Sequence, residues 1–270
     1  MRLLTVVVEG DHDVVFVERT LRSRCGYAPY TARLEDYPRP LGGGATSLLL
    51  SFVRRTAQQS LPLSEAKMVP RPGVDVALQH TDGQTLALVF NTHGVERDLQ
   101  FVRDLHELLS ASPRLNAFRT ADFLFLADAD TVGAAGRAAR LVEVVGGVVG
   151  VSSLAHRAWT QGTLGEVGLY VFAAPDRDAG ALEDHLWPMV QQCRPEAFAA
   201  AQAYIDGCDP PESLLRGNAT RRAKAIITSA GQFAFPGQPM AKMIRHDALS
   251  SEVFRDAPVV VDFADFLSRA

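Results

Sequence analysis

Short apolar runs alternate with longer stretches of helical periodicity along the first two-thirds of the chain. Residues 3–8 form a nearly continuous β-branched and aliphatic run, which is typical of a strand buried on both faces. This run stops at Glu9-Gly10-Asp11, and a helical pattern then continues to about Arg24. The pattern therefore predicts a strand, a tight turn and a helix.

The same plan recurs further along the sequence. Strands are predicted over 74–79, 85–90, 123–127 and 167–172, and helices over about 46–59, 95–110, 133–145 and from 181. Asp82-Gly83, between the first two of these strands, is a good hairpin signal. Strands that alternate with helices at this spacing predict an α/β fold with three layers, α/β/α, and a mainly parallel sheet.

From Pro195 onward the strand signal fades. Helical patterns remain over about 197–205, 212–229 and 262–267. We therefore predict an α/β domain over residues 1–190 and a helical C-terminal extension over residues 191–270 that packs on it.

Composition narrows the class of protein. The chain has 270 residues, 47% of them hydrophobic and 21% charged, with a net charge of −4, which excludes a disordered tail, a collagen-like fibre and a small disulfide-stapled module. Three cysteines at wide spacings, without a zinc pattern, indicate reduced thiols. Neither a signal peptide nor a run long enough for a membrane helix is recognisable. We expect a cytoplasmic protein without a membrane partner.

Acidic residues follow the predicted strands. Glu9 and Asp13 come after the first strand, and Asp128 and Asp130 come after the strand at 123–127. In open parallel sheets, ligands bind beyond the carboxyl ends of the strands. Carboxylates gathered in one crevice repel one another and are costly to desolvate, so a cation between them is favoured. With oxygen ligands only, the expected ion is Mg²⁺ or Mn²⁺ and not zinc.

Each of these motifs also has a purely structural interpretation. Asp13 is placed to cap the first helix. An Asp-x-Asp sequence after a strand also occurs in turns, in glycosyltransferases and in phosphatases. Asp176 and Asp178, after the last strand, fit a solvated turn better than a ligand set. The conjunction of the motifs, and no single one of them, indicates a metal site.

Two of the motifs occur in an order that suggests a family. Val-Val-Val-Glu9-Gly10-Asp-His-Asp13, followed later by Phe-Leu-Phe-Leu-Ala-Asp128-Ala-Asp130, resembles the Toprim fold, the metal-binding module of topoisomerases, primases and OLD-family nucleases. With Leu182-Glu183-Asp184-His-Leu, the chain looks most like standalone, OLD-like Toprim proteins of an uncharacterised family. The resemblance covers about residues 1–190 and, more loosely, Arg222-Ala-Lys224-Ala in the tail.

The resemblance implies a Mg²⁺ (or Mn²⁺) site and a role for each matched residue. The implied metal ligands are Glu9, Asp13, Asp128, Asp130 and Glu183. Glu9 would also serve as general acid/base, and Glu183 would support a second ion. Asp128 and Asp130 would hold the ion against a phosphate, and Lys224 would neutralise charge on the transferring phosphoryl group.

The sequence departs from the family pattern at one turn. Where many Toprim proteins have a glycine-rich turn after the second core strand, this chain has Asn91-Thr92-His93-Gly94. His93 fits a structural hydrogen bonder, and a phosphate contact or proton carrier is the alternative. Asp184 fits a first-turn acid that interacts with the helix dipole.

Three functions are consistent with these residues. The first is nuclease or nuclease-related chemistry on the phosphodiesters of nucleic acid, and the second is a non-catalytic Toprim module that binds metal or nucleic acid and acts through a partner ATPase. The third is a small-molecule phosphotransferase or phosphatase that uses Asp128 and Asp130. The chain has no Walker lysine after Gly42-Gly43-Gly44, which leaves room for a separate ATPase.

The charge of the chain is the main feature against nucleic acid as substrate. The sequence pI is near 6.0, and a protein that neutralises several phosphates usually has a basic face. Arginines cluster at Arg54-Arg55 and again around Arg216, Arg221 and Arg222. Both clusters are also consistent with solvated helix faces. Binding without a partner is therefore expected to be weak.

Overall fold

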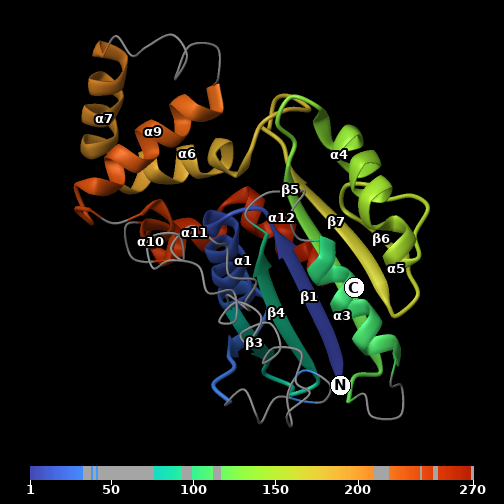
Figure 1. Ribbon diagram of the computed structural model, residues 1–270. Helices are drawn as coiled ribbons and strands as arrows, with labels where there is room; N and C mark the ends of the chain where they lie inside the picture. Colours follow the sequence, from blue (N-terminus) through green and yellow to red (C-terminus); the bar gives the residue numbers. More distant parts are fainter. Residues whose placement is uncertain are drawn as a thin grey trace, which may run out of the picture.

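The structure is a computed structural model. It describes residues 1–32, 38, 41, 76–92, 99–111, 117–208, 219–237, 239–245 and 249–268. Within these ranges the chain folds as a seven-stranded mixed sheet with helices on both faces (Figure 1). The prediction of an α/β fold with helices on both sides of the sheet is confirmed.

The sheet is parallel at its centre and antiparallel at its edges. Across the sheet the strands run β2 (Tyr27–Pro29), β3 (Val76–His80), β4 (Thr85–Asn91), β1 (Arg2–Val8), β5 (Thr120–Asp128), β7 (Glu166–Phe172) and β6 (Ala158–Gln161). Strands β4, β1, β5 and β7 are parallel, whereas β2, β3 and β6 pair antiparallel with their neighbours. The sheet is thus mainly parallel only in its central four strands.

The register of the central strands decides where the site lies. Val8 is paired with Asn91 of β4, and Val7 with Phe125 of β5. Asp128, at the end of β5, is paired with Phe172, the last residue of β7. The carboxyl ends of all four parallel strands therefore meet at one edge of the sheet, which is the upper edge in Figure 1.

Alternate residues of β1 enter two separate hydrophobic clusters, as the two-residue period of a strand requires. Leu4, Val6 and Val8 pack with helix α1 (Asp11–Arg24) and with the helices that follow β7. Leu3 and Val7 face the other side, where α3 (Leu99–Ala111) and the helical segment after β5 cover the sheet. This burial on both faces explains the continuous apolar run at residues 3–8.

The helices that follow β7 lie in two places: the first three gather beyond the carboxyl ends of the strands, and the last three pack beside α1 on its side of the sheet (Figure 1). They are α6 (Leu182–Cys193), α7 (Pro195–Gly207), α9 (Ala219–Gln232), α10 (Met240–Arg245), α11 (Ser251–Asp256) and α12 (Pro258–Leu267). Phe263 of α12 lies with its ring centroid 4.9 Å from that of Tyr170 on β7, and Phe266 stacks on Trp159 at 5.1 Å. One hydrophobic cluster thus joins both sides of the division predicted at residue 190, which itself stays a prediction.

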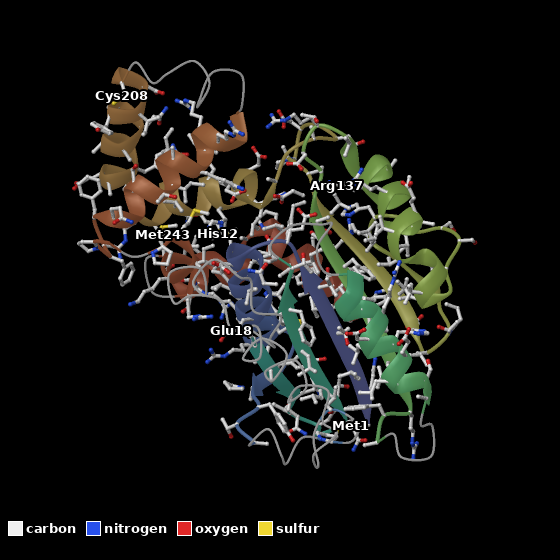
Figure 2. The ribbon with its side chains drawn as sticks, viewed as in Figure 1. Met1, His12, Glu18, Arg137, Cys208 and Met243 are labelled. Atoms are coloured by element: carbon white, nitrogen blue, oxygen red, sulfur yellow. The ribbon has the colours of Figure 1, made fainter. Side chains whose placement is uncertain are left out.

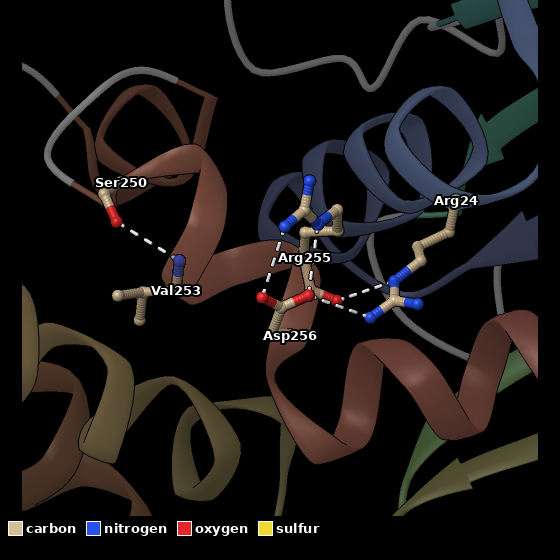
Figure 3. Close-up of polar contacts among 5 residues, drawn as sticks. All are labelled: Arg24, Ser250, Val253, Arg255 and Asp256. Carbon is tan, nitrogen blue, oxygen red and sulfur yellow. Dashed lines mark hydrogen bonds and ion pairs between the residues drawn. The ribbon is translucent and has the colours of Figure 1, made fainter.

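Polar contacts fix α11 against the end of α1 (Figure 3). Arg24 donates through Nε to the carbonyl of Arg255 at 2.8 Å and pairs with Asp256 at 3.1 Å. Ser250 caps α11 by accepting a hydrogen bond from the Val253 amide at 3.2 Å. The first and last parts of the chain are therefore held together at the surface as well as in the core.

Several details differ from the sequence-based elements. The hairpin around Asp82-Gly83 is confirmed as β3 and β4. The helix expected over 133–145 is interrupted: α4 (Gly133–Leu141) continues into a π-helical turn, Val142–Gly146, and then α5 (Gly147–Val149). The helix predicted over 46–59 lies outside the described residues. The short β2, β6, α10 and α11 were not predicted, because three to six residues give no readable period.

None of the described helices is long and apolar enough to cross a membrane.

Candidate acidic site at the strand ends

The edge where the parallel strands end also receives the N-termini of two helices. Glu9 follows β1 directly, and Asp128 is the last residue of β5. Helix α1 begins at Asp11, and helix α6, which follows β7, begins at Leu182. Exposed backbone N–H groups at such helix starts favour nearby carboxylates, so acidic side chains gather here for a local reason.

Asp13 both caps α1 and faces the other acids. The Gly10 amide donates to its Oδ2 at 2.9 Å, so the capping role expected from the sequence is present. The side chain is buried, and burial, followed by the charges of Asp128, Glu183 and Glu9, raises its pKa well above the ordinary value. Asp13 therefore belongs to the acidic cluster as well as to the helix start.

Asp128 links the end of β5 to the start of α6. The Leu182 amide donates to Asp128 Oδ1 at 3.0 Å. Burial and the neighbouring charge of Glu183 raise the pKa of Asp128 to about 7, with a smaller contribution from Glu9. The Leu182 hydrogen bond and the charge of Lys224 oppose this rise without cancelling it.

Glu183 is the most buried acid of the site, with 2% of the residue exposed. Its Oε1 lies 3.3 Å from Nδ1 of His12 and 3.3 Å from Nζ of Lys224. Burial by itself would raise the pKa of Glu183, but the contacts with His12 and Lys224 outweigh it, so the pKa is lowered. Oε2 is buried and has no hydrogen-bond partner among the described residues.

Lys224 reaches this cluster from α9, far away in the sequence. Burial would lower its pKa, but the charges of Glu183 and Asp128 raise it further than burial lowers it. The ammonium group is therefore charged, and it is half-exposed beside the buried carboxylates. This placement brings together the tail residue and the two strand-end motifs that the sequence analysis had combined.

Glu9 and Asp130 lie on the other side of the site, around Arg137 of α4. Burial, opposed by the charge of Arg137, raises the pKa of Glu9. Its Oε1 is buried without a hydrogen-bond partner in the described part of the chain, and Nη1 of Arg137 lies 3.6 Å from it. The Asp130 side chain is 52% exposed and forms an ion pair with Arg137. Asp130 thus lies at the solvent side of the cluster.

The backbone at Asp130 is held in the left-handed region, with φ of 48°. Aspartate tolerates this conformation better than most residues. The Asp130 amide donates to the Gly180 carbonyl at 2.7 Å, and the Gly180 amide donates back at 2.9 Å. This two-bond bridge fixes the loop after β5 against the segment that leads into α6.

The donors at this edge suit a hard cation in kind, but the side chains do not form a ready coordination sphere. As they lie, no group of three or more His, Cys, Asp or Glu side chains in the described ranges is placed to hold a metal ion. The site nevertheless supplies only oxygen donors from its acids, and two buried carboxylate oxygens, one on Glu9 and one on Glu183, lack hydrogen bonds within those ranges. The residues that would hold Mg²⁺ or Mn²⁺ are those predicted from the sequence, and their role as ligands stays a prediction.

Two basic residues of the site were missed by the sequence analysis. His12 lies inside the first motif, and Arg137 lies seven residues after Asp130; Figure 2 labels both at the same end of the sheet. Nothing in the sequence distinguishes Arg137 from Arg140 on the same helix. The structure shows that Arg137 reaches back toward the start of α4 and the end of β5, where its Nε donates to the carbonyl of Asp128.

The remaining candidates have structural roles or lie outside the described residues. Asp176 is 77% exposed in its turn, and Asp178 caps α4 by accepting from the Ala134 amide at 2.9 Å. Asp184 accepts from the Ala181 amide at 2.9 Å in the first turn of α6. Arg222 pairs with Asp206 of α7 at 2.6 Å. His93, Arg54, Arg55 and Arg216 lie outside the described residues.

No protein-family model matches this chain, and no curated protein matches it. Its fold is similar to the crystal structure of a hypothetical protein from Pyrococcus horikoshii OT3, with a TM-score of 0.50 and 13% sequence identity. The similarity covers 100% of this chain and 95% of that chain. At this level of identity the comparison shows the fold alone.

Proposed function

We propose that this protein is a Toprim-type enzyme that carries out Mg²⁺- or Mn²⁺-dependent phosphodiester chemistry on nucleic acid, as a nuclease or nuclease-related subunit. The observation that carries the proposal is the convergence of Glu9, Asp13, Asp128 and Glu183 from four different elements. They influence one another's pKa values, which requires that they lie close together. Such a gathering of buried acids is typical of a functional site.

The side chains suit the chemistry of a phosphoryl group. A bound divalent ion would supply polarisation of a phosphoryl oxygen and a lower pKa for water. The pKa of Glu9 is raised toward neutral pH, so its carboxylate would accept or release a proton more readily than an ordinary glutamate. Lys224 keeps its charge at the half-exposed rim, where it would face an anionic phosphate. His12 is held by Glu183 at the same rim and would add a donor toward that phosphate.

Cleavage assays test this proposal. We expect Mg²⁺- or Mn²⁺-dependent cleavage of plasmid or single-stranded DNA at low salt, because the chain carries a net charge of −4 and will bind phosphates weakly. Glu9→Gln and Asp128→Ala should each lower the rate by about 100-fold or more, the usual effect of losing an acid/base or metal-ligand group. Asp176→Asn removes one exposed carboxylate outside the cluster and should leave the rate unchanged. Cleavage that survives both site variants would refute the proposal.

One observation favours a second function, the non-catalytic Toprim module that acts through a partner ATPase. The carboxylates are engaged by protein cations, and the described side chains form no ready metal site. Such a protein would bind DNA or metal without cutting. We would then expect no cleavage by the isolated chain in Mn²⁺, and an effect on DNA only through the activity of an added partner ATPase. Activity of the isolated chain would exclude this alternative.

A further inference from the structure

Arg137 holds the acidic cluster together from its solvent side. Its Nε donates to the carbonyl of Asp128 at 2.7 Å, and its Nη2 pairs with the carboxylate of Asp130. Its Nη1 lies 3.6 Å from Oε1 of Glu9. Through these contacts one guanidinium group joins the end of β1 to the loop after β5. The Arg137 side chain is only 14% exposed.

The start of α4 places Arg137 in this position. Gly133, the first residue of the helix, has φ of 75°, and a Cβ atom there would lie 2.4 Å from Oδ2 of Asp178. Asp178 in turn caps the helix through the Ala134 amide. Long side chains on a helix point toward its N-terminus. Arg137, in the second turn, therefore reaches back to the strand ends.

The guanidinium group balances the charge of Glu9 without satisfying its oxygen atoms. At 3.6 Å the contact is longer than a hydrogen bond, and Oε1 of Glu9 has no such bond to any residue that the structure describes. Oε2 of Glu183, on a side chain that is 3% exposed, is left in the same state. A divalent ion contacts carboxylate oxygens at about 2.0 to 2.6 Å and would satisfy them.

We propose that Arg137 is a built-in counter-cation that competes with a divalent metal ion for the carboxylates of Glu9 and Asp130. In the metal-free protein the guanidinium group contacts the carboxylates of both Glu9 and Asp130. When the ion binds, the guanidinium group loses its contact with at least one of these carboxylates. The inference rests on the proposed function, since it assumes a divalent ion at this site. It also gives Asp130, which is 52% exposed at the solvent side of the cluster, a partner in the metal-free protein.

Titration calorimetry with Mn²⁺ tests the competition directly. Arg137→Met keeps most of the length of the side chain and removes its charge, and Arg137→Lys keeps the charge but not the three-way contact. We expect Arg137→Met to lower the dissociation constant for Mn²⁺ about tenfold, the effect of removing one competing charge from a site that is partly open to solvent. Arg137→Lys should fall between this variant and the wild type. Arg119→Gln is the matched control, because it removes an exposed arginine at the opposite end of β5.

Thermal unfolding supplies a readout that does not depend on activity. In EDTA, Arg137→Met should unfold at a lower temperature than the wild type, because Glu9 and Asp130 lose their counter-charge. Added Mn²⁺ should raise the unfolding temperature of the variant more than that of the wild type. Arg119→Gln should respond to Mn²⁺ as the wild type does.

The outcomes separate this inference from the proposed function. If the wild type binds Mn²⁺ and Arg137→Met binds it no more tightly, the competition is refuted while the metal site stands. If neither protein binds Mn²⁺, both the metal site and the competition are refuted. The inference is supported if Arg137→Met binds Mn²⁺ more tightly than the wild type while Arg119→Gln binds it as the wild type does. It is also supported if Arg137→Met binds Mn²⁺ and the wild type shows no binding.

Discussion

At the scale of single residues, the acids of this site combine a local and a shared role. Asp13 closes the first turn of α1, and Asp128 accepts the first amide of α6, so each is required by a helix start. The same positions bury them and bring them beside Glu183 and Glu9, and burial, followed by these charges, raises their pKa values. The need to cap a helix therefore fixes where these carboxyl groups lie. Because their surroundings are buried, ionising them lowers the stability of the folded protein.

The raised pKa of Asp128 leads to a prediction about stability. It is about 7 in the folded protein against 3.8 for the ordinary group. Between these values the folded protein keeps a proton that the unfolded chain has released, so the carboxyl lowers stability as pH rises through this range. We expect Asp128→Asn, whose amide oxygen still accepts from Leu182, to be more stable than the wild type by about 1 to 3 kcal/mol at pH 8.

Urea unfolding in EDTA measures this difference. The advantage of Asp128→Asn should become small as pH falls to 4, because the wild-type carboxyl is then protonated in the folded protein and pH 4 is close to its ordinary pKa of 3.8 in the unfolded chain. Asp176→Asn, at an exposed position, should match the wild type at both pH values. A difference between Asp128→Asn and the wild type that stays constant with pH would contradict this explanation.

At the scale of elements, the site is built from the ends of β1 and β5, the starts of α1 and α6, and side chains from α4 and α9. The bridge between Asp130 and Gly180 joins the loop after β5 to the start of α6. Gly180 has φ of 123°, and a Cβ atom there would lie 2.8 Å from the amide nitrogen of Ala174 and 2.5 Å from Oδ2 of Asp184. The turn between β7 and α6 therefore requires glycine at this position.

A substitution at Gly180 tests whether the turn between β7 and α6 requires glycine. Gly180→Ala should lower the free energy of unfolding by about 2 kcal/mol or more, through backbone strain and the clash with Ala174. Gly147→Ala is the matched control: its φ is −65° in a helix, and no atom lies within 4 Å of the added methyl group. It should be neutral or stabilising by up to about 1 kcal/mol. Equal stability of the two variants, measured by urea unfolding, would show that the turn tolerates a side chain at position 180.

At the scale of the whole molecule, one hydrophobic cluster unites the sheet with the C-terminal helices. Phe16 of α1 contacts the ring of Phe172 on β7 at 5.3 Å and the rings of Phe254 and Phe263 at 5.8 Å. Phe254 and Phe263 come from α11 and α12 and are fully buried. One face of the sheet is thus covered by residues from both ends of the sequence.

This arrangement predicts that the α/β part does not fold by itself. A fragment of residues 1–190 would expose the aromatic face that α11 and α12 cover, a loss of several large buried side chains at about 3 to 5 kcal/mol each. We expect the fragment to bind the dye ANS and to lose cooperative thermal unfolding, whereas the full chain unfolds cooperatively. A sharp unfolding transition and dispersed amide NMR signals from the fragment would instead establish residues 1–190 as an autonomous domain.

The sequence pattern predicted the central strands of the sheet well but not its short edge strands or the short helices that pack beside it. Residues 3–8, 85–90 and 123–127 appear as β1, β4 and β5, because a strand buried on both faces is apolar throughout its length. The short antiparallel edges β2 and β6 and the helices α10 and α11 have no such signal. Contacts with the sheet and with the hydrophobic cluster around Phe16 stabilise these short elements, and the local sequence does not encode those contacts.

For the site, local sequence and tertiary structure made different contributions. Sequence alone determined that Glu9, Asp13 and Asp128 follow strands or begin helices, since backbone periodicity and helix starts are local properties. Only the tertiary structure decided that Lys224 reaches Glu183, and that Arg137 is directed at Glu9 and Asp130. These contacts join segments whose meeting depends on packing across the whole sheet, and the sequence pattern of an arginine or a lysine does not record which carboxylate it will face.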